Sequence, residues 1–426
     1  MEKQFDFAYG NTTIPMTVKA GRIDVIESVT PAPIDDLNEA FRRAVEEGAI
    51  GSAPLKDIVA ADDQVTVVIS DITRAYMHQE RICPLLLDYL HDVCGVPYEN
   101  IVYLVAVGTH RQQTEEEFAR IASPYVAQRV RIVNHDCDGE LVRGGVTSRG
   151  TQVDVNPLVV GRKVILLGGT VHHFFAGYGG GRKSILPGVA GRRTVLYNHN
   201  ASFIHARESR QGNLQGNPIH RDMAFAAETA KLAFILNVLL DGDKRIIAAF
   251  AGDSVKAHEA ACALCLQQTR VPVVEADIVV TSNGGYPLDQ NIYQCVKGLT
   301  AAEACVREGG VIILSAGLGD GHGGEAFYHW FADRKDADEV MRDIVNVPAG
   351  ETHMDQWQAQ ILARVQQKAF CIFVTEEVNR AMLEDMHMGW APDMDAAMAM
   401  ASARIGEAAS VTVIPDGVGV IVSAEK

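Results

Sequence analysis

The chain has 426 residues, of which 47% are hydrophobic and 22% charged, a composition typical of a globular protein of two or three domains. The net charge of −16 argues against a nucleic-acid partner, because phosphate backbones bind basic surfaces. No apolar run reaches the roughly 20 residues that span a bilayer, and the N-terminus lacks the apolar core of a signal peptide. We therefore expect a cytoplasmic protein with no nucleic-acid or membrane partner.

Strands and helices are predicted to alternate through the first part of the chain. Short β-branched runs predict strands at 64–70, 100–107, 129–133 and 163–167, and amphipathic patterns predict helices at 33–48, 81–95 and 114–122. The Cys262–Cys265 pair lies in another helix-like run, and without a second pair or nearby histidines we interpret it as helix rather than zinc site. This alternation is typical of parallel sheets covered by helices.

A second run of the same kind begins near Val271. Its predicted strands are 276–281, 310–315 and 370–374, and its predicted helices are 292–308, 355–368 and 394–403. We therefore predict an α/β fold with two domains, mostly parallel sheets and an active-site cleft between them. Residues 1–270 would form the N-terminal domain and 271–404 the C-terminal domain. Residues 405–426, with two strands around the Pro415-Asp416-Gly417 turn, are predicted to return to the first domain.

Polar residues directly follow several of these strands. In α/β sheets, ligands bind at the carboxyl ends of the strands. Asp71 and Arg74 follow the strand at 64–70, and His110 follows the strand at 100–107. Arginine suits a carboxylate because its planar fork binds both oxygens. Tyr293 and Lys297, four residues apart, would face the same side of one helix.

A glycine-rich segment, GYGGGRKS at 177–184, differs by one residue from a P-loop, because Arg182 stands where a P-loop has glycine before its lysine. Glycines free the backbone to approach an anion, and Arg182 and Lys183 could bind one phosphate group. Three histidines flank the segment: His172, His173 and His199. Imidazole is both a common transition-metal ligand and a proton carrier near neutral pH.

Taken together, these motifs resemble the nickel-dependent lactate racemase family of 2-hydroxy-acid racemases and epimerases. The resemblance extends over nearly the whole chain. It rests on seven ordered motifs: DITR at 71–74, GTHR at 108–111, HFFAGYGGGRKSILPGVA at 173–190, YNH at 197–199, YQCVKG at 293–298, DGHGG at 320–324 and QWQ at 356–358.

The resemblance implies a nickel-pincer nucleotide cofactor, a pyridinium mononucleotide whose two sulfur-bearing arms hold nickel. Lys183 would bind it covalently, and His199 would be the protein's nickel ligand. His110 and His173 would be the paired acid/base residues, and Arg74, Gln294 and Lys297 would hold the substrate carboxylate. The remaining cofactor contacts would be Asp71, Thr73, Gly179, Gly180, Gly181, Arg182, Tyr293 and Trp357. The N-terminal domain would thus anchor the cofactor.

The chemistry explains why these residue types are needed. The C2 hydrogen of a hydroxy acid is poorly acidic beside a carboxylate, so removing it as hydride, through a 2-keto acid, avoids a carbanion. The 2-keto acid is planar and has two opposed faces, so two histidines are required, one for each orientation of the hydroxyl group. The cofactor supplies the hydride chemistry. We expect a small-molecule 2-hydroxy acid as substrate and cofactor-biosynthesis enzymes as partners. A host that lacks those enzymes would yield protein without cofactor.

Departures and alternatives bear on the substrate and on the class of protein. The sequence departs from the lactate-type pattern at Ala75 and at Tyr76–His78, and Cys295 lies between predicted pocket residues. The identity of the substrate side chain is therefore left open. His172 beside His173 leaves an ambiguity that the spacing to Lys183 resolves in favour of His173. A phosphate- or nucleotide-handling enzyme and a non-catalytic carrier of the nickel nucleotide are the two alternatives, and assembly into a homo-oligomer is left open.

Overall fold

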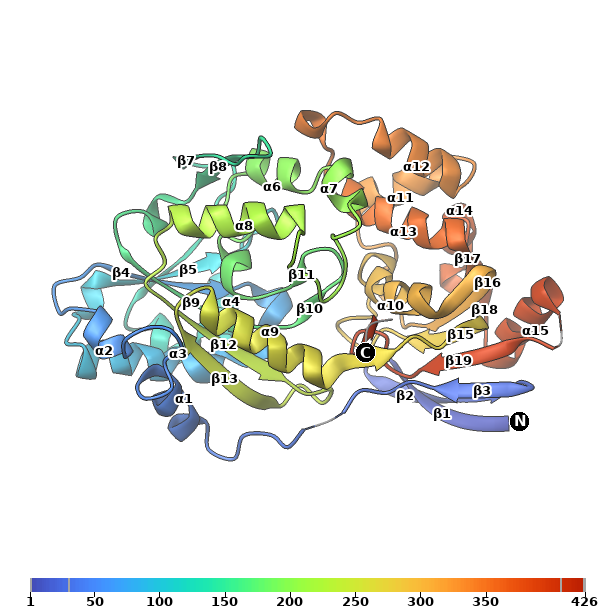
Figure 1. Ribbon diagram of the computed structural model, residues 1–426, viewed down its shortest axis with the longest axis horizontal. Coiled ribbons are helices and arrows are strands. Elements are labelled where there is room, and N and C mark those ends of the chain that lie inside the picture. Colours follow the sequence, from blue (N-terminus) through green and yellow to red (C-terminus); the bar gives the residue numbers. More distant parts are fainter. Residues whose placement is uncertain (1, 30, 407, 424–426) are drawn as a thin grey trace. The chain divides into compact units, whose positions relative to one another are not determined.

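The computed structural model describes residues 2–29, 31–406 and 408–423, which form two compact units (Figure 1). Of these residues, the first unit comprises 31–199 and 205–268, and the second comprises 2–29, 200–204, 269–406 and 408–423. Each unit is built around its own six-stranded sheet. The two-domain α/β architecture with mostly parallel sheets is therefore confirmed.

The sheet of the first unit has the strand order β13-β12-β9-β4-β5-β6. Its strands are β4 (Val65–Ser70), β5 (Ile101–Ala106), β6 (Arg131–Asn134), β9 (Lys163–Gly169), β12 (Phe234–Leu240) and β13 (Ile246–Gly252). All neighbours are parallel except β12 and β13. β4 is buried along almost its whole length, as its β-branched sequence predicted, because it lies between β9 and β5 and contributes to the core.

Helices and short turns connect these strands. They are α1 (Leu37–Val45), α2 (Leu55–Ile58), η1 (Ile72–Met77), α3 (Gln79–Asp88), η2 (Tyr89–Val93), η3 (Tyr98–Asn100), α4 (Glu115–Ala122), α5 (Pro124–Ala127), η4 (Pro157–Val159), η5 (Gly181–Ser184), α6 (Arg192–Asn198), α8 (Pro218–Thr229) and α9 (Lys256–Thr269). Two hairpins add the strands β7 (Val142–Val146), β8 (Gln152–Val155), β10 (His172–His173) and β11 (Gly177–Tyr178). α4 begins where the sequence predicted, because Thr114 and Glu117 form a reciprocal capping box.

The sheet of the second unit is parallel throughout, in the order β18-β17-β16-β15-β19-β3. The strands of this unit are β1 (Glu2–Tyr9), β2 (Thr12–Lys19), β3 (Arg22–Val25), β14 (Arg270–Pro272), β15 (Ala276–Ser282), β16 (Val306–Ser315), β17 (Ala369–Val374), β18 (Gly389–Ala391), β19 (Ser410–Ile414) and β20 (Ile421–Ser423). Its helices are α7 (Ala201–His205), α10 (Ile292–Cys305), α11 (Glu325–Ala332), α12 (Ala337–Val345), η6 (Ala349–Glu351), α13 (Gln356–Lys368), η7 (Glu377–Asn379), α14 (Arg380–Asp385) and α15 (Met394–Ile405).

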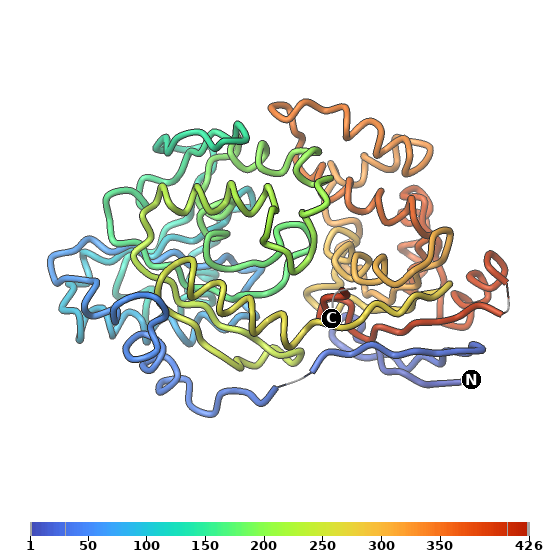
Figure 2. Tube along the Cα trace, viewed as in Figure 1, coloured from blue at the N-terminus to red at the C-terminus, as the bar shows by residue number. Residues whose placement is uncertain are grey.

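The first strands of the chain, within residues 2–29, and the C-terminal strands both belong to the second unit, which corrects the predicted domains at 1–270 and 405–426. β19 pairs with β15 and β3, and β20 pairs with β14, so the red end of the chain lies beside the blue N-terminal strands in Figure 2. Val411 and Val413 pack in one buried cluster with apolar residues of β15 and of the β1–β2 hairpin. The prediction that residues 405–426 return to the first domain is therefore wrong, because an alternating pattern predicts a strand but does not choose between two sheets.

Two smaller predictions can be compared with the structure. Among the described residues, no helix is long and apolar enough to cross a membrane. The eight cysteines are buried free thiols. Cys262 and Cys265 lie on α9, in agreement with the helical interpretation of that pair.

Candidate active site

Asp71 and His110 form a hydrogen-bonded pair at the carboxyl ends of two adjacent strands. Asp71 follows β4 and His110 lies beyond β5, and the two strands are parallel, so both loops leave the same edge of the sheet. The His110 Nδ1 atom lies 2.6 Å from Oδ2 of Asp71. The aspartate side chain is 5% exposed whereas the imidazole is 57% exposed. A buried acid therefore orients an accessible imidazole.

The surroundings of Asp71 keep its carboxyl group ionised. Burial alone would raise the pKa of Asp71, but the hydrogen bond and charge of His110, the charge of Arg74 and the hydroxyl of Thr73 together hold it below its usual value. Thr73 Oγ1 donates to Asp71 Oδ1 at 2.5 Å. The carboxylate thus accepts the Nδ1–H of His110, which leaves Nε2 as the ring nitrogen that does not face Asp71. An imidazole held in this tautomer can exchange a proton at Nε2.

Arg74 lies on the same short turn, η1. Its Nη1 donates to the hydroxyl of Thr73 at 3.0 Å and to the Thr73 carbonyl at 3.3 Å. The DITR motif at 71–74 and the GTHR motif at 108–111 are thus neighbours at the sheet edge. The structure brings together the residues that the sequence predicted at the ends of β4 and β5.

The glycine-rich segment folds as the short β10–β11 hairpin followed by η5. Gly180 and Gly181 have φ angles of 74° and 49°, which favour glycine. A Cβ atom on Gly180 would lie 2.8 Å from the carbonyl oxygen of Gly169, and one on Gly181 would lie 2.8 Å from the ring of His258. The glycines therefore let the turn that carries Lys183 pack directly against β9 and α9.

One aromatic ring, that of Phe175, contacts three predicted site residues. Its centroid lies 4.4 Å from that of the His173 ring and 5.2 Å from that of the His199 ring, edge-on in both cases. The Lys183 ammonium lies 5.8 Å from the same centroid. Phe175 is buried, so its position is fixed by packing. His173, Lys183 and His199 are therefore brought together around one ring.

His199 has the donor chemistry of a metal ligand. It follows α6, and its Nδ1 lies 3.0 Å from the carbonyl oxygen of Val195. Burial, followed by the charge of Lys183, lowers the pKa of His199 to about 3, so the ring is neutral. With Nδ1–H directed at a carbonyl, Nε2 holds the lone pair, which is the form that binds a transition metal. His199 and Lys183 therefore fit a nickel cofactor attached to this segment.

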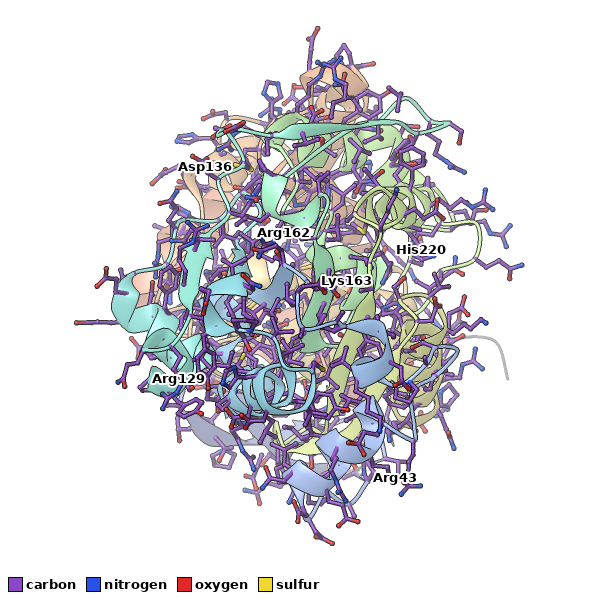
Figure 3. All side chains as sticks on the ribbon, turned by 90° about the vertical axis from the view of Figure 1, so that its left-hand side faces the viewer. Arg43, Arg129, Asp136, Arg162, Lys163 and His220 are labelled. Atoms are coloured by element: carbon purple, nitrogen blue, oxygen red, sulfur yellow. The ribbon has the colours of Figure 1, made fainter. Side chains whose placement is uncertain are left out.

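Arg182 is buried and hydrogen-bonded within its own loop and to neighbouring histidines. Its guanidinium donates to His220 Nδ1 at 2.7 Å and to the carbonyls of Ala176 and Tyr178 at 3.0 and 3.1 Å, and lies 2.9 Å from His258 Nε2. Figure 3 labels His220, which lies on α8. Burial lowers the pKa of Arg182 to about 10, where it is still charged at neutral pH. All three nitrogens thus have protein partners, and the predicted contact of Arg182 with the cofactor stays a prediction.

In the second unit, the first turns of α10 carry Gln294 and Lys297. The Lys297 ammonium donates to Oε1 of Gln294 at 2.6 Å. Asn291 caps the helix by accepting a hydrogen bond from the backbone N–H of Gln294 at 2.9 Å. Cys295, which the sequence places between them, is fully buried in the core and does not share their partly exposed face.

Tyr293 and Trp357 lie together in this unit. The Tyr293 hydroxyl donates to Oδ1 of Asp355 at 3.1 Å and is also hydrogen-bonded to Trp357. Its ring packs edge-on against Phe327. Burial raises the pKa of Tyr293, so the phenol stays protonated. The first turn of α13 is thereby joined to the first turn of α10.

Phe175 and Asp355 were missed by sequence reasoning. Phe175 belongs to an apolar stretch that reads as ordinary core, and only its place between His173 and Lys183 could have drawn attention to it. Asp355 resembles a helix cap by its position before α13, yet its side chain accepts from Tyr293 on another helix. Contacts of this kind depend on the folded chain.

The chain matches two protein-family models. Residues 9–212 match the lactate racemase N-terminal domain, and residues 271–422 match the lactate racemase C-terminal domain. A lactate racemase from Lactiplantibacillus plantarum is 45% identical over 379 residues, which cover 88% of this chain and 89% of that protein. A lactate racemase from Thermoanaerobacterium thermosaccharolyticum is 42% identical over 389 residues, covering 90% of each.

Two solved structures are also similar to this chain. The lactate racemase apoprotein from Thermoanaerobacterium thermosaccharolyticum superposes with a TM-score of 0.94 at 39% identity, over 99% of this chain and 100% of that one. A protein from Thermotoga maritima has a TM-score of 0.63 at 18% identity, over 92% of this chain and 98% of that one, and shares the fold. These similarities confirm the family resemblance and the enzyme class, isomerase, that the motifs predicted.

Proposed function

The chain belongs to the lactate racemase family, and from this premise we propose that it interconverts the enantiomers of a small 2-hydroxy acid, with lactate as the first candidate. The observation that carries the proposal is the accessible His110 imidazole held on the buried Asp71 carboxylate, 2.6 Å away. A side chain oriented in this way suits general acid/base work on a hydroxyl group.

We propose that the first unit anchors a nickel-pincer nucleotide. Lys183 would hold it covalently and His199 would bind the nickel through Nε2, the nitrogen opposite its bond to Val195. Asp71, Thr73 and the glycines 179–181 would surround the nucleotide, and Tyr293 and Trp357 would line the pocket. When bound, this group supplies the acceptor for the C2 hydrogen as a hydride.

The chain's own residues would bind the substrate and move its hydroxyl proton. Arg74 of the first unit, with Gln294 and Lys297 of the second, would hold the carboxylate. His110 would take the hydroxyl proton in one orientation of the substrate, and His173 in the other. Binding of its carboxylate would keep the planar 2-keto acid in the site while it turns its second face toward the cofactor.

The contacts of Arg182 disfavour the phosphate-handling alternative. In that alternative the arginine beside Lys183 would bind a phosphate group, but its nitrogens donate to backbone carbonyls and to His220. The near miss to the P-loop pattern has a structural explanation instead, since the arginine holds the backbone of the loop.

The experiment is to co-express the chain with cofactor-making enzymes and to supply single enantiomers of 2-hydroxy acids deuterated at C2. Racemisation with retention of the deuterium is expected. Complete exchange with solvent would exclude hydride transfer, and absence of racemisation across the panel, in protein shown to carry nickel, would overturn the proposed activity.

A double variant separates catalysis from storage of the cofactor. His110→Ala with His173→Ala should abolish racemisation and leave nickel bound, because neither histidine is proposed as a ligand. A carrier of the cofactor would need Lys183 and His199 but no proton carriers. If the unaltered chain passed its nickel to another protein and racemised no hydroxy acid, that result would favour the carrier.

A further inference from the structure

Gln113 joins the loops that follow three consecutive strands of the first sheet. Its side-chain Oε1 accepts a hydrogen bond from the backbone N–H of Ile72 at 3.2 Å, and its Nε2 donates to the carbonyl of Arg111 at 2.8 Å. Its own backbone N–H and carbonyl pair with the side-chain amide of Asn134, both at 2.9 Å. These partners follow β4, follow β5 and end β6, in the order in which the strands lie in the sheet.

The two side-chain bonds of Gln113 reach the direct neighbours of the acid/base pair. Ile72 follows Asp71, and Arg111 follows His110. Gln113 is 6% exposed, so both bonds are shielded from competing water. A single amide therefore sets the separation between the backbone that carries the carboxylate and the backbone that carries the imidazole.

This separation matters because the ring of His110 is largely exposed and receives little support from packing. Its side chain is 57% exposed, and the bond to Asp71 holds Nδ1 at 2.6 Å. A charge-assisted hydrogen bond of this length weakens steeply when its partners move apart. Displacement of either loop would release the ring into many rotamers.

We propose that Gln113 is a positioning residue that holds the β4 and β5 loops in register and thereby keeps His110 on Asp71. In this proposal it acts on the reaction through His110, and its side chain is hydrogen-bonded to the backbone of Ile72 and Arg111. The consequence for catalysis rests on the proposed function of His110, whereas the geometric role can be tested without any turnover.

The test is Gln113→Met, which keeps an unbranched side chain of similar length and removes both side-chain hydrogen bonds. The matched control is Gln64→Met, which also removes two hydrogen bonds, to Asn100 and from Arg162, next to the opposite end of β4. The readout is the downfield proton NMR resonance of the His110 Nδ1–H in the full chain, assigned by its disappearance in His110→Gln.

We expect Gln113→Met to lose or broaden this resonance at unchanged far-UV circular dichroism, and Gln64→Met to retain it. In cofactor-loaded protein, kcat should fall roughly 10- to 100-fold with little change in KM, because a displacement of about 1 Å costs that much. If Gln113→Met does not fold, Gln113→Glu, which keeps the acceptor for Ile72 but loses the donor to Arg111, replaces it with the same expectation.

An undisturbed resonance in a folded Gln113 variant would overturn the proposal, whatever the activity. If the unaltered chain does not racemise any hydroxy acid, the proposed function fails while the resonance still decides the role of Gln113. The two failures are therefore distinguishable.

Discussion

The Nδ1 atom of His110 and Oδ2 of Asp71 lie 2.6 Å apart, and they join a largely exposed ring to a buried carboxylate. The same carboxylate accepts from Thr73 through its other oxygen. Both oxygens of Asp71 are therefore engaged by donors, which selects the imidazole tautomer with its lone pair on Nε2. The pair has the features of an acid/base residue and the residue that orients it.

Replacing this carboxylate with an amide should abolish most activity. In Asp71→Asn the side-chain NH2 group would favour Nδ1 of His110 as an acceptor and move the ring proton to Nε2, the wrong nitrogen. We expect kcat per nickel-loaded chain to fall roughly 10²- to 10⁴-fold, measured by initial rates divided by the nickel content from metal analysis. Asp136→Asn, an exposed aspartate of the same unit, is the control. A loss of less than tenfold would show that Asp71 does not orient the ring.

Removing the charge of Lys297 should weaken substrate binding. Its ammonium lies on the partly exposed face of α10 and donates to Oε1 of Gln294 at 2.6 Å, and we propose that it binds the substrate carboxylate. Since a hydrogen bond to a charged group contributes about 1.5–3 kcal/mol, Lys297→Met should raise KM roughly 10- to 100-fold. Lys368→Met, in which the lost lysine donates to the backbone carbonyl of Glu303, should leave KM unchanged. Equal effects of the two variants would contradict a carboxylate-binding role.

Replacing Arg182 should disturb cofactor loading through the loop that it holds. A lysine cannot donate at once to the carbonyls of Ala176 and Tyr178 and to His220, so Arg182→Lys should lower the free energy of unfolding by about 1–3 kcal/mol. The fraction of chain carrying the proposed adduct on Lys183, measured by intact mass, should also fall.

The control for this variant is Arg162→Lys. Arg162, labelled in Figure 3, also donates to several groups, among them the carbonyls of Val65 and Asn100, but it lies before β9, away from the glycine-rich segment. It should lose stability with normal loading. Normal loading in Arg182→Lys at reduced stability would contradict the positional role of Arg182.

The two histidines around Arg182 predict an acid-sensitive fold. Burial, followed by the charge of Arg182, lowers the pKa of His220 and of His258 to about 3, from 6.5. Between these values the unfolded chain binds protons that the folded chain does not, so stability is present above pH 6.5 and is lost as the pH falls toward 3. Each histidine contributes a slope of about 1.4 kcal/mol per pH unit.

The measurement is urea unfolding of the cofactor-free chain at several pH values between 7 and 4, on the order of one pH unit apart. His220→Asn keeps an acceptor for Arg182 and removes one titrating ring, so its stability should fall less steeply with acid than that of the unaltered chain. Parallel slopes for the two proteins would show that His220 is protonated in the folded state.

Local sequence patterns were sufficient to predict many of the strands and helices. β4 and β5 were predictable because β-branched apolar runs suit a strand buried on both faces, and α4 because its capping box lies in four consecutive residues. The segment at 410–422 was equally recognisable as strands, but its place was not, since pairing with β15 depends on contacts across more than a hundred residues of chain.

The candidate site divides in the same way. The residue types and the order of the motifs identified the family and predicted Lys183, His110 and His199 as site residues without any structure. This was possible because the reactivity of an amine or an imidazole is a property of the side chain. Only the tertiary structure brought Asp71 to His110, placed His173, Lys183 and His199 around Phe175, and turned Arg182 inward to the backbone of its own loop. The sequence specifies which groups can react, whereas hydrogen-bond partners and burial depend on which elements fold against one another.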